Sequence, residues 1–259
     1  MDGRGDARPS RFKMTEPPTA PLLALDHVSK NFGALKVIDD LSLSVAAGEA
    51  LGIIGPNGAG KTTLFNLITG DLSVNAGSIR FADRDVTGLP AYARCRLGVG
   101  RTYQIPHPFG NMTVFENVLA GAAFGATRRE AESYQRCVEL LQLTNLLAKA
   151  NLPAGKLTLL ERKRLELARA LATDPKLLLL DEIAGGLTDT ECQLLIETIR
   201  AVHASGVSII WIEHIVHALI AVVGRLFVID FGQMLAEGEP RTVMDSPQVQ
   251  QVYMGIEAE

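Results

Sequence analysis

The chain has 259 residues, of which 47% are hydrophobic and 21% are charged, and its formal net charge is -4. This length suits one large domain or a core with a subdomain. The mild acidity, and the lack of any run of Lys and Arg, argue against nucleic acid as a partner. The cysteines Cys95, Cys137 and Cys192 are widely spaced without metal-ligand spacing, so they suit a reducing compartment.

Two segments could be mistaken for targeting or membrane elements. Residues 1–21 are polar and proline-rich and lack the apolar stretch of a secretory signal, so we expect a disordered leader. Residues 207–230 are apolar enough to suggest a membrane span, but they include Glu213 and Arg225, and each central charge costs about 2.5–3.5 kcal/mol on insertion. We expect a buried strand, a turn, a helix and another strand there, and a membrane link only through a partner.

The elements predicted along the first part of the chain indicate an α/β fold. Residues 22–54 alternate like strands and then become fully apolar, and a helix follows from about residue 60 to 69. The stretch 77–90 has the pattern of a hairpin that glycine and proline close. Residues 106–154 are mostly helical and bounded by prolines, which indicates a helical insertion of approximately 106–170 in the core.

An amphipathic helix is predicted next, at 157–171. Thr158 is its N-cap, and Glu161 three residues later completes a capping box. Apolar residues then recur at helical spacing, with the charges on the other face. Two leucines, Leu159 and Leu160, occupy the first turn, where helices more often begin with polar residues. Taken alone, the segment is ordinary structure.

The remaining elements complete a parallel sheet. The runs "LLLL" at 177–180 and "SIIWI" at 208–212 are candidate central strands, because parallel strands buried on both faces are apolar throughout. Strand structure returns over 226–238. Residues 245–259 are expected to form a small terminal helix.

The segment "GPNGAGKTT" matches the phosphate-loop motif G-x-x-x-x-G-K-[ST], and it follows an apolar strand and opens a helix. Its glycines let backbone N–H groups turn inward around an anion, and the helix N-terminus adds positive partial charge. Lys61 supplies a charge for the β- and γ-phosphates, and the Thr62 hydroxyl is a ligand for Mg²⁺. The predicted nucleotide-binding residues are Gly55, Pro56, Asn57, Gly58, Ala59, Gly60, Lys61, Thr62 and Thr63.

Further polar groups follow two predicted strands, at the edge where open α/β sheets bind ligands. Asp181 is expected to hold Mg²⁺ through water, and Glu182 to orient or deprotonate an attacking water. His214 follows the next strand and could reach a γ-phosphate, whereas His217 is expected on a helix surface. An acidic pair alone could be a solvated strand end, but beside a phosphate loop that alternative is weak.

Together these motifs resemble the ATP-binding cassette (ABC) ATPases over essentially all of residues 22–257, in the family's order and spacing. The resemblance implies one ABC ATPase domain over 22–259. Its fold would be a P-loop NTPase core of mostly parallel sheet flanked by helices, with an N-terminal antiparallel β subdomain and a helical insertion. ATP and Mg²⁺ are the implied cofactors. Phe32 of "KNFG" would stack on adenine, Gln104 of "GRTYQIP" would contact Mg²⁺ and the attacking water, and His214 would sense the γ-phosphate. For Phe32 the alternative is an apolar residue that ends a strand.

The resemblance also implies head-to-tail dimers, in which each ATP lies between one subunit's phosphate loop and the other subunit's signature segment. The family signature is LSGGQ, and residues 157–161 read "LTLLE". Thr158 keeps the hydroxyl that would meet the nucleotide, but Leu159 and Leu160 replace the glycines that let the backbone approach. The ATP site weakened by these leucines would be the partner's. The other departures from the family pattern are Ile183, Thr188 and Ile215.

Within the family, residues 97–122 and 232–255 are similar to one of the two cassette types in branched-chain amino-acid importers. This similarity implies a second ABC ATPase subunit in a heterodimer, two integral membrane permease subunits and, indirectly, a periplasmic solute-binding protein. The chain would be peripheral, at the cytoplasmic face of the inner membrane. A coupling helix of a permease would enter a groove that includes Phe109, Met112 and Phe115, although ordinary core is the alternative for these three.

Three interpretations of the function follow. The leading one is an ATP-hydrolysing, nucleotide-binding subunit that powers uptake of branched-chain amino acids or a related small solute across the inner membrane. The departures from the family pattern favour, as the alternative, a nucleotide-gated regulatory cassette with low turnover of its own. A soluble, non-transport ABC ATPase acting on ribosomes or DNA fits less well, because the chain has one cassette, no basic stripe and no long heptad run.

Overall fold

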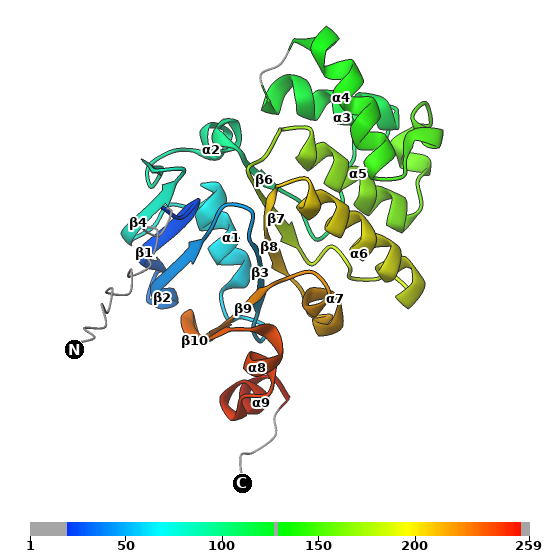
Figure 1. Cartoon of the computed structure of the whole chain (residues 1–259). Helices are drawn as coiled ribbons and strands as arrows, with labels where there is room; N and C mark the ends of the chain where they lie inside the picture. Colours follow the sequence, from blue (N-terminus) through cyan, green and yellow to red (C-terminus); the bar gives the residue numbers. More distant parts are fainter. Residues whose placement is uncertain (1–19, 127–128, 255–259) are drawn as a thin grey trace, which may run out of the picture.

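Two β-sheets with a helix between them form the centre of the structure (Figure 1), a computed structural model that describes residues 20–126 and 129–254. Residues 1–19 of the expected leader and residues 255–259 of the expected terminal helix lie outside the described residues. The α/β class and the mostly parallel central sheet that the sequence predicts are confirmed.

The smaller sheet is antiparallel and has the strand order β2-β1-β4-β5. Its strands are β1 (Leu23–Phe32), β2 (Leu35–Val45), β4 (Ala76–Phe81) and β5 (Arg84–Asp85). Over the second half of β2, buried and exposed residues alternate, because one face of the sheet packs on the core and the other meets solvent. The hairpin expected at 77–90 is the pair β4 and β5, in which Phe81 lies opposite Arg84.

The larger sheet has six strands in the order β10-β9-β3-β8-β7-β6, and all neighbours are parallel except the edge pair β10 and β9. Its strands are β3 (Ala50–Ile54), β6 (Val99–Arg101), β7 (Leu177–Asp181), β8 (Ser208–Ile212), β9 (Arg225–Asp230) and β10 (Gln233–Gly238). Every residue of β3, β7 and β8 is buried. Burial on both faces explains why these strands are continuous apolar runs.

Each face of the six-stranded sheet packs on its own hydrophobic core. One core lies between the two sheets and includes α1 (Lys61–Thr69), which α2 (Ala91–Leu97) contacts. The other core joins the opposite face to the remaining helices. These are α3 (Val114–Gly125), α4 (Glu130–Leu143), α5 (Leu159–Leu171), α6 (Asp189–Ala204), α7 (Val216–Ile220), α8 (Pro240–Met244), α9 (Pro247–Met254) and the short 3₁₀ helix Ala154–Lys156. A second 3₁₀ helix, Leu147–Lys149, has no buried residue.

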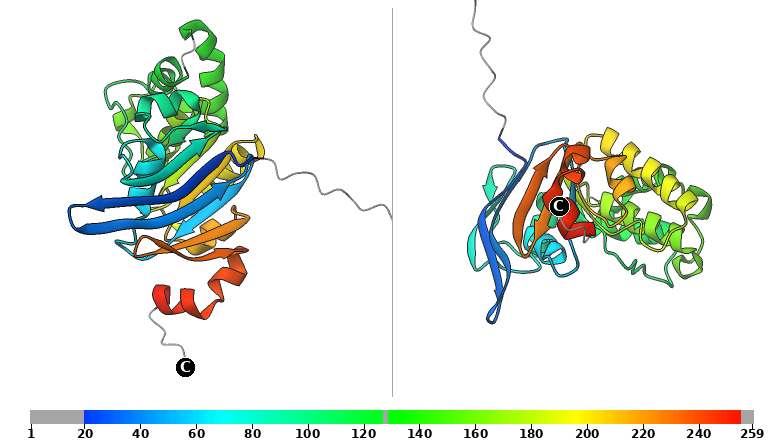
Figure 2. Two further views of the ribbon diagram at one scale, coloured as in Figure 1. Left: turned by 90° about the vertical axis from the view of Figure 1, so that its left-hand side faces the viewer. Right: turned by 90° about the horizontal axis from the view of Figure 1, so that it is seen from below.

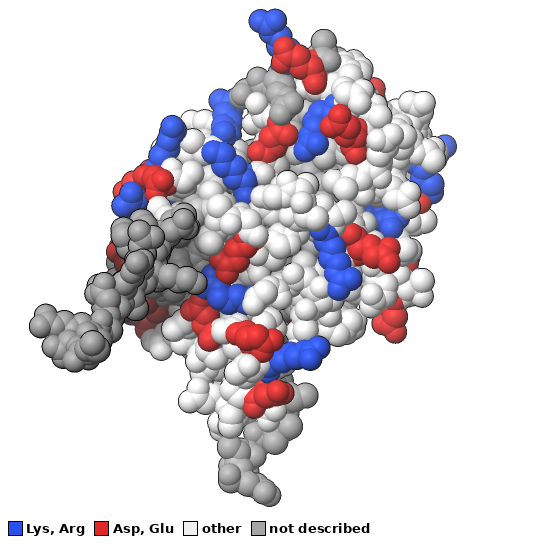
Figure 3. Space-filling model, in the orientation of Figure 1, with Lys and Arg blue, Asp and Glu red and all other residues white. Residues whose placement is uncertain are grey.

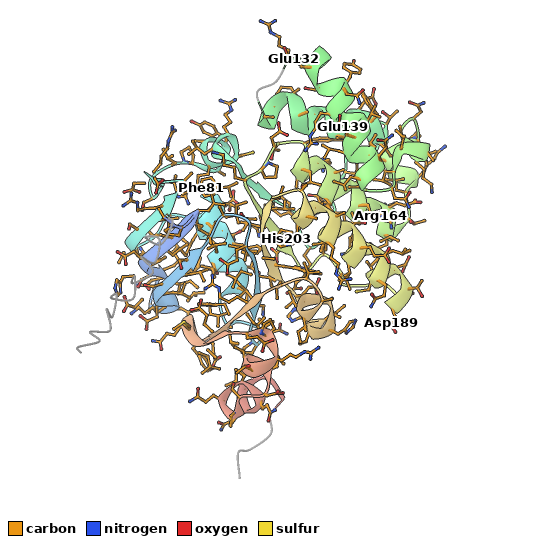
Figure 4. All side chains as sticks on the ribbon, in the orientation of Figure 1. Phe81, Glu132, Glu139, Arg164, Asp189 and His203 are labelled. Atoms are coloured by element: carbon orange, nitrogen blue, oxygen red, sulfur yellow. The ribbon has the colours of Figure 1, made fainter. Side chains whose placement is uncertain are left out.

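Helices α3, α4 and α5 build a lobe at one end of the molecule. Figures 1 and 2 show α3 and α4 at the end opposite to the C-terminal helices α8 and α9, and Glu132 and Glu139 mark α4 in Figure 4. Helix α5 joins this lobe to the sheet, because it contacts α3, α4, α6 and β6. The helical subdomain that we propose over approximately 106–170 contains α3, α4 and nearly all of α5.

Helix α5 begins as the sequence predicts. Thr158 Oγ1 accepts a hydrogen bond from the Glu161 N–H, and the Glu161 carboxylate accepts one from the Thr158 N–H. The face that carries the charged residues of this helix is not exposed to solvent. Lys163, Arg164 and Glu166 are only 3%, 7% and 7% exposed, because α5 packs against α3, α4, α6 and β6. Periodicity identifies a helix, but it does not show how many sides of it are covered.

The apolar segment 207–230 forms β8, α7 and β9, as expected. Across the described ranges, no helix combines the length and the apolar character that crossing a bilayer requires. The terminal helix starts earlier than expected, as α8, and restarts as α9, because Pro240 and Pro247 each favour a new helix start. On the face drawn in Figure 3, acidic and basic side chains are interspersed.

Candidate active site

The phosphate loop connects β3 to α1. Gly60, the N-cap of α1, has a φ of 105°, in the left-handed region that favours glycine. A Cβ at Gly60 would also lie 2.8 Å from the carbonyl oxygen of Val37, so the position has no room for a side chain. No side chain caps α1, and no acidic residue lies in its first turn. The N–H groups and the positive end of this helix are therefore available to an anion.

Lys61 follows the phosphate loop, and its side chain folds back onto it. Its ammonium group donates hydrogen bonds to Gly55 O at 2.7 Å and to Pro56 O at 3.0 Å. Burial lowers the pKa of Lys61, and the carboxylates of Glu182 and Asp181 act in the opposite direction. The lysine and the two acidic residues therefore form one electrostatic site.

Glu182 is the centre of a hydrogen-bonded group from three separate loops. Gln104 Nε2 donates to Glu182 Oε2 at 2.5 Å, and His214 Nε2 lies 2.6 Å from Glu182 Oε1. Glu182 has a φ of 45°, and such a conformation costs on the order of 1–3 kcal/mol in a residue other than glycine. Strained residues of this kind gather at functional sites. The structure thus brings together the three residues that the sequence singles out for catalysis.

The donor atoms near the loop match a magnesium ion. Asp181 ends β7 and is 5% exposed, and Thr62 is exposed on the first turn of α1. The Asp181 carboxylate, the Thr62 hydroxyl and the Gln104 amide are hard oxygen donors, which Mg²⁺ prefers. The residues present therefore fit the ion that the sequence implies.

A cavity of about 360 Å³ lies over the phosphate loop and reaches Glu182. Phe32 does not line it: this ring ends β1, is 48% exposed, and has the ammonium of Lys30 at 5.4 Å from its centroid. Thr158 also lies outside it, exposed at the start of α5. The cavity lining comprises Leu35, Val37, Asn57, Gly58, Gly60, Lys61, Thr62, Thr63 and Glu182.

Two buried charges that the sequence does not single out support this group. Glu213 Oε1 accepts a hydrogen bond from the Ala184 N–H at 2.6 Å, and Oε2 accepts one from the His214 N–H at 3.1 Å; burial raises the pKa of Glu213. Lys163 of α5 donates to the carbonyl oxygen of Gln104 at 3.4 Å, and burial lowers its pKa. An acidic residue ending a fully apolar strand is the signal that could have identified Glu213.

The departures from the family pattern have local structural roles. Thr188 caps α6 and forms a capping box with Glu191. Ile183 is buried in the core, at 1% exposure. The two leucines of α5 differ, because Leu160 is 8% exposed and belongs to the core, whereas Leu159 is 43% exposed. Only Leu159 therefore presents its side chain at the surface of the helix start.

A second cavity, of about 250 Å³, lies between the core and the helical lobe. Residues of α2, β6, α3 and α5, among them Arg169, line it together with Tyr103. Phe109, expected in a groove here, is 50% exposed and lies over the Arg169 guanidinium at 4.8 Å. Met112 and Phe115 are partly buried. Phe115 packs on the core and lies 5.4 Å from the ring of Tyr134, which is the ordinary-core alternative for this residue.

A strand-to-helix phosphate loop beside an Asp–Glu pair at the edge of a parallel sheet defines a P-loop nucleotide-binding protein. A sequence profile of the ABC transporter family matches residues 38–185, and this chain belongs to that family. It is an ATP-hydrolysing cassette, the ATP-binding subunit of a transporter.

Similar proteins cover nearly the whole chain. The high-affinity branched-chain amino acid transport ATP-binding protein LivG of Salmonella typhimurium is 35% identical over 250 residues, which are 91% of this chain and 98% of that protein. The lipopolysaccharide export system ATP-binding protein LptB of Acidithiobacillus ferridurans is 35% identical over 234 residues, 90% of this chain and 97% of that protein. A crystal structure of an ATP-binding cassette in its ADP conformation superposes with a TM-score of 0.85 at 31% identity, covering 92% of this chain and 100% of that one.

Proposed function

We propose that this chain powers uptake of branched-chain amino acids, or a related small solute, as one of two different cassettes in an importer. It would lie at the cytoplasmic face of the inner membrane, bound to two permease subunits that a periplasmic solute-binding protein supplies. The observation that carries the proposal is Glu182, held between Gln104 and His214 beside the phosphate loop. The similarity to LivG supports the choice of solute.

The chemistry is transfer of a phosphoryl group to water, in which positioning and charge neutralisation supply most of the acceleration. Lys61 and the N-terminus of α1 would hold the phosphates. Glu182 would orient and deprotonate the water, with Gln104 fixing one carboxylate oxygen and His214 contacting the γ-phosphate. Phe32 would stack on the adenine.

The metal site would consist of Thr62, Asp181 and Gln104. When bound there, Mg²⁺ supplies charge neutralisation at the phosphate oxygens. The protein's part is to hold the donor atoms in place, and Asp181 is the one donor that is both charged and buried.

The proposal of hydrolysis at this chain's own phosphate loop is tested with Glu182→Gln, compared with the same change at the matching Glu of the partner cassette. We expect Glu182→Gln to lower turnover in the assembled transporter by about 10²–10⁴-fold at this site, because a positioned base is lost. Binding of ATP serves as the control and should persist. Near-complete loss of turnover from the partner's change alone would contradict the proposal and favour a nucleotide-gated subunit with low turnover.

The importer assignment is tested by purification from native membrane and identification of the subunits that co-purify. Two permeases and a second cassette are expected. Recovery of ribosomes or DNA would instead indicate a soluble, non-transport ATPase.

The solute needs a measurement of its own, because the LptB relative is as similar to this chain as LivG is. Screening the associated binding protein for ligands should identify a branched-chain amino acid or a related small solute, and a ligand of another chemical class would contradict this choice of solute.

We also propose that the signature segment makes the two ATP sites of the dimer unequal. The N-terminus of α5 would point at the ATP of the partner, with Thr158 presenting its hydroxyl and Leu159 keeping the backbone away. Because Leu160 is buried and Leu159 is exposed, Leu159→Gly is a cleaner test than replacing both leucines. Combined with Glu182→Gln, which silences this chain's own site, Leu159→Gly should raise the remaining turnover. An unchanged rate would count against unequal sites.

A further inference from the structure

Arg101, the last residue of β6, is a buried charge that none of the roles described above uses. Its side chain is 7% exposed and lies between two rings, with its guanidinium carbon 5.6 Å from the centroid of Phe65 and 4.9 Å from that of Tyr103. Burying a charge is costly unless partners compensate it. Several polar groups hold this guanidinium in place.

The guanidinium connects β6 to the end of β7 and to the C-terminal half of α1. Its Nη2 donates to Asp181 Oδ2 at 2.8 Å, at the end of β7. Its Nη1 donates to Asn66 Oδ1 of α1 at 2.5 Å and lies 3.5 Å from the Asp71 carboxylate that follows α1. Within the described residues, Arg101 Nε has no hydrogen-bond partner. The contacts to Asp181, Asn66 and Asp71 therefore compensate the cost of burying this charge.

We propose that Arg101 is a positioning residue that fixes the Asp181 carboxylate for Mg²⁺. It holds Oδ2 in a hydrogen-bonded ion pair at 2.8 Å, which restricts rotation of the carboxylate, and no described residue donates a hydrogen bond to Oδ1. This inference rests on the proposed role of Asp181 in holding the metal. Residues that orient metal ligands in this way commonly affect metal affinity as strongly as 10–100-fold.

A second buried arginine provides a control that distinguishes positioning of the Asp181 carboxylate from simple packing. Arg94 is 1% exposed and donates to the carbonyl oxygens of Leu67 and Ile68, at the same end of α1. It makes no contact with Asp181 within the hydrogen bonds and ion pairs of the described residues. Removal of Arg94 should therefore lower stability like removal of Arg101, without touching the metal donor.

The experiment measures the dissociation constant of ATP for the purified full chain with EDTA and with saturating Mg²⁺, using fluorescence of a labelled ATP. The ratio of the two constants reports what the metal contributes to binding. In Arg101→Met we expect this contribution to fall by about tenfold or more, with binding in EDTA retained. In Arg94→Met the ratio should equal that of the natural chain, whatever happens to its melting temperature.

Asp181→Asn distinguishes failure of this inference from failure of the proposed metal site. If Asp181→Asn leaves the ratio unchanged, both are overturned. If Asp181→Asn lowers the ratio but Arg101→Met does not, Arg101 is only structural and this inference alone is overturned. When both act, Arg101→Met should have no further effect on the ratio in the Asp181→Asn background, because the arginine acts through that carboxylate.

Arg101→Lys keeps the inference testable if the methionine variant does not fold. Lysine retains the charge but not the fork that binds two acceptors at once. In Arg101→Lys we expect the Mg²⁺ contribution to ATP binding to fall less than in Arg101→Met. The matched variant Arg94→Lys should show no loss. Equal ratios in Arg101→Lys, Arg94→Lys and the natural chain would overturn the inference.

Discussion

Two helix N-termini in this molecule are built for different tasks. Helix α1 has a glycine N-cap, no side-chain cap and no acidic residue in its first turn. Helix α5 has a complete capping box, so Thr158 and Glu161 use part of the hydrogen-bonding capacity of its first turn. Glu161 also adds a negative charge there, which an ion pair with Lys149 partly offsets. One helix end offers its N–H groups to a ligand, and the other satisfies part of them from its own sequence.

These two helix starts determine which contact with ATP the chain can supply well. An anion is stabilised at a helix N-terminus by free N–H groups and positive partial charge, and α1 provides both. At α5 the capping box stabilises the helix itself, and the carboxylate of Glu161 opposes an approaching phosphate. Because α5 would face the partner's nucleotide, the same chain would form one strong half-site and one weak half-site.

The largest effect is expected from Lys61→Ala, which removes the side-chain charge at the α1 end. Loss of a charged, hydrogen-bonded partner of a phosphate typically costs 2–5 kcal/mol or more, which corresponds to roughly 30-fold or more in ATP affinity. Binding of labelled ATP to the purified chain measures it. Arg164→Ala, at another buried cationic residue of α5, is the control and should leave affinity much less changed; equal losses would mean that general destabilisation is responsible.

A second prediction concerns how the two leucines of α5 affect the free energy of unfolding. Leu160→Ala should lower the free energy of unfolding by about 2–5 kcal/mol, because it opens a cavity in a packed core. Leu159→Ala should cost much less, since its side chain is 43% exposed. Denaturant titration of both variants measures the difference. Similar costs for the two would show that Leu159 is also anchored in the core.

Much of this architecture could be predicted from the sequence, because local signals dominate it. The fully apolar β3, β7 and β8 and the glycine-rich turn before α1 each specify their conformation within a few residues. The capping box of α5 is equally local. Family order and spacing then placed Gln104, Glu182 and His214 in one site.

The contacts of the supporting residues could not be predicted, because they join segments that are distant in the sequence. Arg101 and Asp181 are 80 residues apart in the chain, and Glu213 reaches the Ala184 N–H across 29 residues. The burial of Lys163 in α5 similarly depends on elements that surround the helix. Helical periodicity places such charges opposite the apolar face, but it does not show whether other elements cover that side.

A smaller effect is expected from Thr158→Ala, which removes the cap of α5. Loss of such a cap costs about 1 kcal/mol. Thr113→Ala is a matched control, because Thr113 caps α3 with the same kind of capping box, completed by Glu116. Both variants should lose similar stability in thermal unfolding. Only Thr158→Ala should also change turnover in the assembled transporter, since only its hydroxyl would meet the partner's ATP.

The smallest effect is expected from Glu161→Gln, which keeps the capping box and removes the charge. Glutamine can replace glutamate in a capping box, so the helix start should stay intact. A charge near a helix N-terminus is worth about 0.3–1 kcal/mol, which corresponds to roughly 2–5-fold in rate. In a Glu182→Gln background, where turnover comes only from the partner's phosphate loop, we therefore expect a rise of this size.

Glu191→Gln, in the matching capping box of α6, is the control for Glu161→Gln. It removes an acidic side chain from a helix start that is not the signature segment, so the partner's rate should stay unchanged. A rise with both variants would point to overall charge. If neither variant changes the rate, the carboxylate of Glu161 does not oppose the nucleotide, and the weakness of this half-site would then depend on Leu159 alone.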